Sequence, residues 1–262
     1  VHAGYVAAGS DVVATATFGA SPPKLASAGL AGRCRELNEL GARLAREAAR
    51  AGAVGGAVAR PGGGGAPVLV AGDVGPTGLL LPPVGGADEA QLEAAFAEQA
   101  EALAGAGVDL LLIETMYDRR EALAAVRAAR RTGLPALACL TFEARRRGWF
   151  TVMGDALVPS LQELAAAGAE AAGFNCSVTS DVMVAMAAAA APQVGVPLIA
   201  QPNAGQPRAT PAGVVYDADP AGFARDLTAM ADAGARLLGG CCGTTPAFIA
   251  AARRALDERS GR

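Results

Sequence analysis

Two adjacent cysteines near the end of the chain, Cys241 and Cys242, lie in the run LLGGCCGTTP, and a third, Cys176, lies in GFNCS. Neighbouring side chains of a regular strand point to opposite faces, so adjacent cysteines act together only where the strand has ended. The surrounding glycines permit the backbone to turn there. Three thiolates form a soft ligand set that suits zinc, and a zinc ion with three protein ligands keeps a fourth position for chemistry. These residues therefore predict a catalytic zinc site.

Other interpretations of the cysteines are weaker. A structural zinc site normally has four ligands, often from CxxC pairs, which this sequence lacks. A redox pair of Cys241 and Cys242 would require a strained disulfide between neighbours. Cys34 falls on a predicted helix and Cys139 inside a predicted strand, so we expect both to pack in the core. His2 is the only histidine. We expect it at the surface, so a histidine general base is not expected.

Composition limits the classes of function. The 262 residues are 52% hydrophobic, which suits one large α/β domain with a substantial core. A formal net charge of -3 gives no electrostatic reason to expect nucleic acid or an anionic membrane as a partner. No apolar run approaches the ~20 residues of a membrane span, and the N-terminus lacks a signal-peptide pattern. Five cysteines in a chain of this length do not make a disulfide framework, so we expect a reducing, cytoplasmic setting.

The elements that must position the cysteines alternate along the chain. Short β-rich segments are separated by longer segments rich in alanine, leucine, glutamate and arginine, which is typical of parallel βα units. Strands are predicted at residues 11–16, 67–72, 109–115, 135–141, 171–176, 197–201 and 235–239. Helices are predicted at residues 34–51, 88–105, 119–132, 156–167, 180–191, 220–233 and 246–258. The expected C-caps are Gly107, Gly133, Gly168 and Gly234, and the expected N-caps are Asp88, Ser180 and Asp219.

This pattern predicts a (β/α)8 TIM barrel that lacks its first strand. Residues 1–8 have the composition of a helix tail, and seven strands follow it. We expect a single barrel domain over residues 1–262, truncated at its N-terminus. The alternative is an open, doubly wound sheet of seven strands. The glycine-rich run at residues 60–65 is expected to be a flexible loop, since the strand and the GK[ST] ending of a phosphate-binding loop are missing.

A barrel would bring the distant cysteines together. Its active site lies at the C-terminal mouth, and each interior layer is made by alternate strands. With the first strand absent, Cys176 ends the sixth strand and Cys241 follows the eighth, so their sulfurs can share one layer. Polar residues follow other strands at the same edge, namely Thr15, Thr17, Asp73, Glu114, Thr115, Asn175 and Asn203. The cluster predicts a site at the mouth, although Glu114 alone would also suit a helix cap.

Seven motifs span nearly the whole chain in one order: AGSDVVATATFGAS, GDVGPTG, DLLLIET, TFEARRRGWFTVMGD, GFNCS, QPNAGQP and GGCCGTTP. Together they resemble the homocysteine S-methyltransferase family, and most closely the homocysteine-binding barrel of cobalamin-dependent methionine synthase. GFNCS combined with GGCCGTTP is the specific part of this resemblance. It implies a zinc ion on Cys176, Cys241 and Cys242, and it implies that Glu114 holds the ammonium group of homocysteine. The residues implied to line or brace the substrate pocket are Thr17, Asp73, Asn175 and Asn203.

The resemblance also implies a reaction, the methylation of homocysteine to methionine through a zinc-bound thiolate. The implied donor is methylcobalamin on a corrinoid domain or protein, because this chain has no corrinoid-binding segment. Alternatives are a stand-alone enzyme that uses S-methylmethionine, S-adenosylmethionine or betaine, and a truncated barrel that binds zinc or a partner without turnover. The sequence departs from the family in three places. No strand with a DGAMGT-like loop precedes Val1, Ala16 replaces the asparagine of TNTF, and Phe248 stands where a histidine is common.

Overall fold

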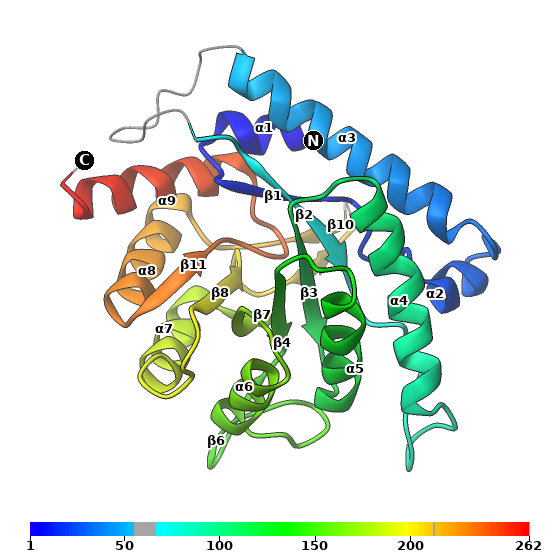
Figure 1. Cartoon of the computed structure of the whole chain (residues 1–262). Coiled ribbons are helices and arrows are strands. Elements are labelled where there is room, and N and C mark those ends of the chain that lie inside the picture. The colour runs from blue at the N-terminus through cyan, green and yellow to red at the C-terminus, as the bar shows by residue number, and fades with distance from the viewer. Residues whose placement is uncertain (55–65, 212, 262) are drawn as a thin grey trace.

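The computed structural model describes residues 1–54, 66–211 and 213–261 (Figure 1). The predicted loop at residues 60–65 lies outside these ranges. The main sheet is parallel, and its strand order is β1 (Val12–Ala14), β2 (Leu69–Val74), β3 (Leu110–Met116), β4 (Ala136–Leu140), β7 (Ala171–Thr179), β8 (Leu198–Asn203) and β11 (Ala235–Leu238). Each corresponds to a predicted strand. The sheet curls as in a barrel, with β1 and β11 as its two edges, so the prediction of a TIM barrel without its first strand is confirmed.

The predicted helices cover the outside of the curled sheet (Figure 1). They are α3 (Cys34–Val54), α4 (Glu89–Gly105), α5 (Arg119–Arg130), α6 (Leu157–Ala166), α7 (Ser180–Ala190), α8 (Pro220–Asp232) and α9 (Pro246–Arg259). The expected helix tail at the start of the chain is α1 (His2–Ala7). Among the described residues, no helix combines the length and apolar character needed to cross a membrane.

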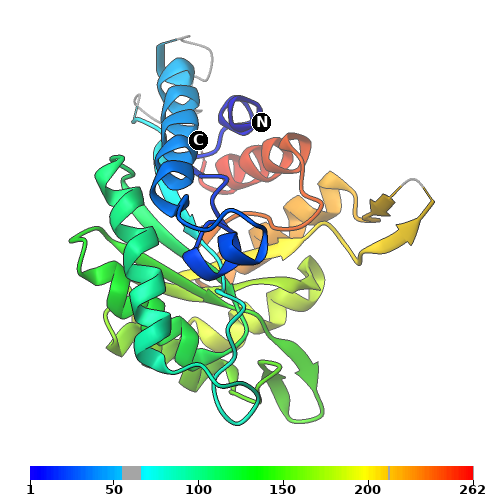
Figure 2. The same ribbon diagram turned by 90° about the vertical axis from the view of Figure 1, so that its right-hand side faces the viewer.

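Some elements escaped the sequence analysis. A short helix, α2 (Pro22–Ser27), follows β1. The loop after β4 folds into a hairpin of β5 (Glu143–Arg145) and β6 (Gly148–Phe150), and the loop after β8 into one of β9 (Arg208–Thr210) and β10 (Gly213–Val215). Figure 2 shows both hairpins projecting from the same side of the molecule. Their strands have three residues each, which is too short for a periodic sequence signal.

Local capping largely follows the sequence. The four predicted C-cap glycines all have positive φ angles, as Gly107 does at 80°. Asp88 forms a capping box with Gln91, and Asp219 accepts hydrogen bonds from two backbone N–H groups of α8. The prediction for Ser180 is wrong. Thr179 occupies the N-cap of α7, and the Ser180 hydroxyl donates to the Asp226 carboxylate at 2.5 Å, because a charged acceptor on α8 lies within reach.

Alternate residues of the strands face two apolar layers. Leu111 and Ile113 of β3 belong to the larger core between sheet and helices, whereas Leu110 and Leu112 face the inside of the barrel. The inner cluster consists of Ala71, Leu110, Leu112, Leu137, Cys139, Ala171 and Ile199. Cys139 and Cys34 are both buried, as predicted. The inner layer forms the floor beneath the polar mouth.

The barrel is open between β1 and β11. A cavity of about 590 Å³ lies there, and its lining runs from α1 and α9 past the inner leucines to Gly240 and Cys241. His2 is half-buried rather than at the surface, because its Nε2 lies 3.1 Å from the carbonyl oxygen of Ala14 on the edge strand. The open edge therefore connects with the region that carries the cysteines.

Candidate metal centre

The polar residues of the mouth continue the inward alternation of the strands. Ala71 faces the barrel interior and Asp73 follows it by two residues, just as Leu112 is followed by Glu114. Asn175 stands four residues after Ala171 on β7. Because side chains repeat every two residues along a strand, the packing that buries the inner leucines also aims these polar groups into the mouth.

The three predicted zinc ligands converge in space. The Sγ atoms of Cys176 and Cys242 are 3.7 Å apart, those of Cys241 and Cys242 are 4.0 Å apart, and all three lie within 4.8 Å of one another. A tetrahedral zinc with Zn–S bonds of about 2.3 Å separates its sulfur ligands by about 3.8 Å. All three cysteines are free, and Cys242 is exposed. The donor set and its spacing therefore fit a zinc ion held by three protein ligands.

Cys176 reaches this cluster through an unusual backbone. Cys176 and Ser177 have φ angles of 60° and 62°, in the left-handed region that non-glycine residues rarely occupy. The pairing of β7 with β8 is irregular from Asn175 to Thr179. Residues in such conformations cost about 1–3 kcal/mol each and gather at functional sites. The two left-handed residues turn Cys176 away from the strand's alternation and toward the other sulfurs.

The loop that carries Cys241 and Cys242 is fixed by its backbone and by β8. The Cys241 N–H donates to the Pro202 carbonyl at 2.8 Å, and the Cys242 N–H donates to Oδ1 of Asn203 at 3.1 Å. A Cβ atom on Gly240 would lie 2.4 Å from the Thr244 side chain, so the turn admits no larger residue. Asn203 thus braces the sulfur loop from the neighbouring strand.

The three sulfurs cannot all be thiolates without a cation. Hydrogen bonds from Cys241, the Ser177 backbone, Cys242 and Asn203 lower the pKa of Cys176 to about 5, although burial opposes this. The hydrogen bond to Cys176, together with burial, raises the pKa of Cys241. Burial and the charge of Cys176 raise the pKa of Cys242. These shifts favour a state with one thiolate and two thiols. A divalent metal would offset two of the three negative charges and so stabilise all three cysteines as thiolates.

A pair of carboxyl groups faces the sulfurs from the other side of the mouth. Asp73 is 6% exposed, and its Oδ1 has no hydrogen-bond partner among the described residues. Burial, and then repulsion by Glu114, raises the pKa of Asp73. Burial, and then the charge of Cys176, raises the pKa of Glu114 to about 7. The pair resists double ionisation, so an ammonium group placed between them would find strong acceptors.

Asn175 connects the two sides. Its Oδ1 accepts from the Thr115 N–H at 2.7 Å, while its Nδ2 lies 3.3 Å from Oε2 of Glu114 and 3.7 Å from Sγ of Cys241. Thr115 has a φ of 61°, so the strand that carries Glu114 is also distorted at this point. One buried amide therefore sets the position of the carboxylate relative to the sulfurs.

Thr17 lies beneath the carboxyl pair. It is 1% exposed, and its hydroxyl donates to the carbonyl oxygen of Asp73 at 2.7 Å, with the Thr15 hydroxyl 2.5 Å away. Gln99 of α4 donates to the carbonyl oxygen of Thr17 at 2.8 Å. Through these contacts Thr17 supports the end of β2. The predicted contact of Thr17 with the substrate stays a prediction.

Sequence reasoning missed Tyr216, which follows β10. It packs against Gly243 and interacts with the sulfur of Cys242. Its only sequence signal was a lone aromatic residue in a polar loop. The position is not predictable, because it depends on a hairpin whose strands were not predicted.

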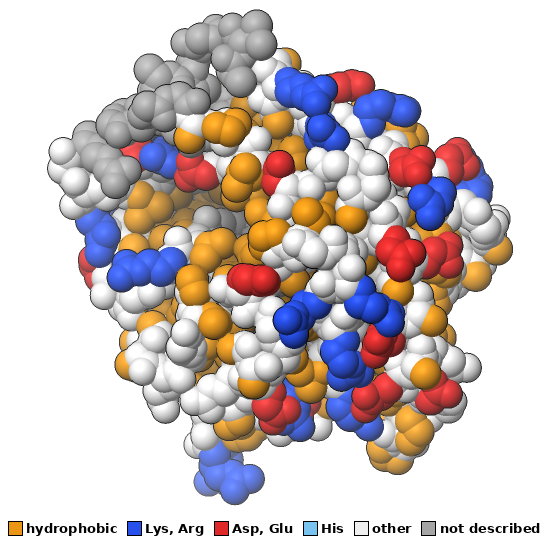
Figure 3. All heavy atoms as spheres, in the orientation of Figure 1, with side chains coloured by type: hydrophobic (Ala, Val, Ile, Leu, Met, Phe, Trp, Pro, Cys, Tyr) orange, Lys and Arg blue, Asp and Glu red, His pale blue; other side chains and the backbone are white. Residues whose placement is uncertain are grey.

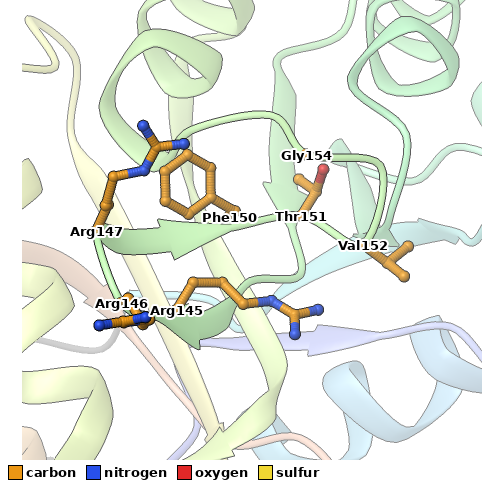
Figure 4. Close-up of a pocket in the computed structure, with 7 residues that line it drawn as sticks. All are labelled: Arg145, Arg146, Arg147, Phe150, Thr151, Val152 and Gly154. Carbon is orange, nitrogen blue, oxygen red and sulfur yellow. The ribbon is translucent and has the colours of Figure 1, made fainter.

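A separate pocket of about 450 Å³ lies at the β5–β6 hairpin (Figure 4). Its lining residues are Arg145, Arg146, Arg147, Phe150, Thr151, Val152 and Gly154, and none of them belongs to the cysteine or carboxyl groups. Basic side chains gather at this tip of the surface, at the lower edge of the view (Figure 3). The hairpin therefore carries a local cluster of positive charge, apart from the cysteines and the carboxyl pair.

The chain is similar to proteins of known activity. The sequence model of the family described as homocysteine S-methyltransferase matches residues 1–256. A methionine synthase of Mycobacterium tuberculosis is 31% identical over 256 residues, and one of Mycobacterium leprae is 29% identical. Both alignments cover 95% of this chain but only 20% of the relative, so the chain spans about a fifth of these curated proteins.

Solved structures give the same indication. The metallated form of the homocysteine methyltransferase MmuM from Escherichia coli is 29% identical to this chain, with a TM-score of 0.78. The superposition covers 97% of this chain and 82% of that one. The shared fold extends over nearly all of this chain and about four fifths of MmuM.

Proposed function

Because this chain belongs to the homocysteine S-methyltransferase family, we propose that it transfers a methyl group to the thiol of homocysteine and so forms methionine. The observation that carries the proposal is the meeting of three free sulfurs and two buried carboxyl groups in one mouth. A soft metal site beside an acceptor for an ammonium group matches the two ends of a thiol amino acid.

Cys176, Cys241 and Cys242 would hold a zinc ion, as their spacing fits. A free alkyl thiol has a pKa near ~8.5, so only a few per cent is thiolate at neutral pH. When bound, zinc supplies Lewis acidity that lets the substrate sulfur react as a thiolate. In the reaction the thiol loses its proton, the new S–CH₃ bond forms, and the donor keeps the electron pair of the broken bond.

Glu114 and Asp73 would bind the substrate ammonium group. Both carboxyl groups have raised pKa values because they are buried near other negative charge. A bound ammonium ion would compensate that charge and satisfy the Oδ1 of Asp73. The role is positioning, since the ammonium contact aims the thiol at the methyl donor. Asn175 and Asn203 would keep the two ends of the site in register through their hydrogen bonds.

A corrinoid domain or protein is the donor that we favour. Large apolar side chains are exposed on loops after the C-terminal ends of the strands, namely Phe18, Leu80, Val84, Val152, Val214 and Val215. A contiguous exposed apolar patch marks a surface that meets a partner, and these side chains would form such a patch beside the mouth. Methylcobalamin carried by such a partner would reach the mouth from outside the barrel. The alternative donors are small molecules, namely S-methylmethionine, S-adenosylmethionine and betaine.

The second candidate function is a zinc-binding barrel without turnover. The cavity at the open edge of the sheet favours it, because the cavity reaches Cys241 and would admit water to the site. Solvent inside the mouth weakens the electrostatic contacts on which positioning depends.

One experiment separates these functions. Metal analysis of the purified chain measures zinc, and methionine formation from homocysteine is followed with methylcobalamin, S-methylmethionine, S-adenosylmethionine and betaine in turn. Stoichiometric zinc and methionine from at least one donor support the enzyme. Stoichiometric zinc without methionine from any donor supports the non-catalytic barrel, and absence of zinc contradicts both.

A further inference from the structure

The three sulfurs of the metal centre are themselves nucleophiles. A methyl donor that reaches the mouth meets the cysteine ligands as well as the substrate sulfur, and Cys242 is the exposed one of the three. Methylation of a ligand would convert a thiolate into a neutral thioether and weaken the metal site. Some feature of the chain must direct the methyl group to the substrate instead.

Each ligand sulfur has a hydrogen-bond donor from this chain. Cys176 receives hydrogen bonds from the Ser177 backbone and from Asn203, and the Asn175 amide lies 3.7 Å from Sγ of Cys241. The donor beside Cys242 is the phenol of Tyr216. A hydrogen bond withdraws electron density from a thiolate and so lowers its reactivity.

Tyr216 is placed closely over the sulfur loop. A Cβ atom on Gly243 would lie 2.3 Å from Cγ of the tyrosine ring, and Gly243 has a φ of 79°. Both observations exclude any other residue at that position. The aromatic ring thus occupies the space that a side chain at Gly243 would need, one residue from the exposed Cys242.

The base of the β9–β10 hairpin is tied to the same loop. The Ala204 N–H donates to the Cys242 carbonyl at 2.9 Å, and the Ala218 N–H donates to the Ala204 carbonyl at 3.0 Å. Oδ1 of Asp217 accepts from the Gln206 N–H at 3.2 Å, and it occupies the space that a Cβ atom on Gly205 would need. These bonds hold the two residues after Tyr216 against the start of the hairpin, which is itself bonded to Cys242, so the backbone that carries the ring is tied to the sulfur loop.

We propose that Tyr216 protects the Cys242 sulfur from methylation and thereby directs the methyl group to the substrate thiol. Its ring packs against Gly243, the residue next to Cys242, and its hydroxyl is the phenolic donor that acts on the Cys242 sulfur. The inference rests on the proposed function. In the suppressed side reaction the Cys242 sulfur would form an S–CH₃ bond, and the donor's leaving group would depart with the electron pair. Tyr216 touches only the ligand, so its role is one of positioning and selectivity.

Methyl iodide tests this directly, because it delivers a methyl group to exposed thiolates and releases iodide without homocysteine or a partner. The zinc-loaded chain is treated with it, and peptide mass spectrometry follows methylation of Cys176, Cys241 and Cys242 over time. Tyr216→Phe retains the ring and removes the hydroxyl. Tyr5→Phe is the matched control, because the Tyr5 hydroxyl donates at 2.8 Å to the Thr244 carbonyl on the same loop but not to a sulfur.

Tyr216→Phe is expected to increase the rate of Cys242 methylation by about tenfold, the effect of one hydrogen bond to a charged group. Zinc should be lost as the thioether forms, and Tyr5→Phe should match the wild type. Tyr216→Leu, which also removes the ring, should react faster still. Unchanged Cys242 methylation in both Tyr216 variants would overturn the proposal, as would zinc loss before any methylation. Because homocysteine turnover is not measured, failure here is distinguishable from failure of the proposed function.

Discussion

The two sides of the mouth are built in different ways. The sulfur side depends on irregular backbone, with left-handed angles at Cys176 and Ser177 and a glycine-rich loop at Cys241. The carboxyl side depends on regular strands, because Asp73 and Glu114 follow the inward alternation of β2 and β3. A strained segment needs something to hold it in place, whereas a strand is held by its neighbours. We therefore expect a change on the sulfur side to affect metal binding and a change on the carboxyl side to affect substrate binding and stability.

The largest expected effect is on the sulfur side. Cys176→Ala and Cys241→Ala should each lose zinc and all measurable methyl transfer, because a three-sulfur site has no spare ligand. Metal analysis and a methylation assay measure both. Cys139→Ala, a substitution of a buried cysteine in β4, is the control and should keep zinc. If either ligand variant retained stoichiometric zinc, the two distant segments would not form one centre.

The carboxyl side should respond to pH. The folded pKa of Glu114, about 7, exceeds the ordinary value of 4.5 for a glutamate, so the folded chain binds more protons between these pH values than the unfolded chain does. Stability from this group is therefore greatest below the unfolded pKa and falls as pH rises through the folded one. The loss amounts to at most about 3 kcal/mol. Asp73, whose pKa is also raised, changes in the same direction.

Urea unfolding of the zinc-free, reduced chain at several pH values measures this loss. Cys176 acts in the opposite direction, since its folded pKa is lowered to about 5. The wild type is therefore compared with Glu114→Gln. The contribution of Cys176 to the pH dependence of stability is largely the same in both proteins, so it cancels in the comparison. The variant should gain stability relative to the wild type as pH rises from about 4.5 to about 7. A constant difference across this range would show that Glu114 is not a buried acid.

Homocysteine affinity should depend on the carboxyl side of the mouth independently of zinc binding on the sulfur side. Glu114→Gln should weaken homocysteine binding by about tenfold to a hundredfold, which is the effect of losing one hydrogen bond between charged groups. Zinc content should stay at the wild-type value, because Glu114 is not among the clustered sulfur ligands. Calorimetric titration of the zinc-loaded chain with homocysteine gives the affinity. An unchanged affinity would remove the ammonium-binding role from this residue.

The sequence specified the regular parts of this molecule better than the irregular ones. The succession of short β-rich segments and longer helical segments was enough to find the strands of the main sheet, and it also placed Asp73 and Glu114 at the strand ends. The three clustered cysteines were singled out through residue type, because thiolates suit a soft metal and glycines beside them permit a turn. The geometry of Cys176 was not predictable. The strand positions, sixth and eighth in an eight-stranded barrel, suggested that Cys176 and Cys241 share one interior layer. The left-handed backbone angles that bring the Cys176 sulfur to Cys241 depend on tertiary packing.

The two hairpins were missed for a different reason. Their strands are too short for periodicity, and their residues are largely exposed. Tyr216 was missed with them, although it follows β10 and lies against the sulfur loop. Functional residues on such loops are positioned by contacts with distant segments, which local sequence does not encode.

A substitution at Thr17 tests whether this residue only supports β2 or also contacts the substrate. Its buried hydroxyl donates to the Asp73 carbonyl at 2.7 Å, and Thr17→Val has nearly the same shape without that donor. Loss of the bond should lower the free energy of unfolding by about 1–3 kcal/mol, because a buried acceptor is left without it. Zinc content should not change, and homocysteine affinity should fall by less than about threefold if Thr17 only braces β2.

A loss of affinity comparable to that of Glu114→Gln would instead place the hydroxyl in the substrate pocket, as the family resemblance implies. Urea unfolding and calorimetric titration of the same variant distinguish these outcomes, since a brace affects mainly the first and a substrate contact mainly the second.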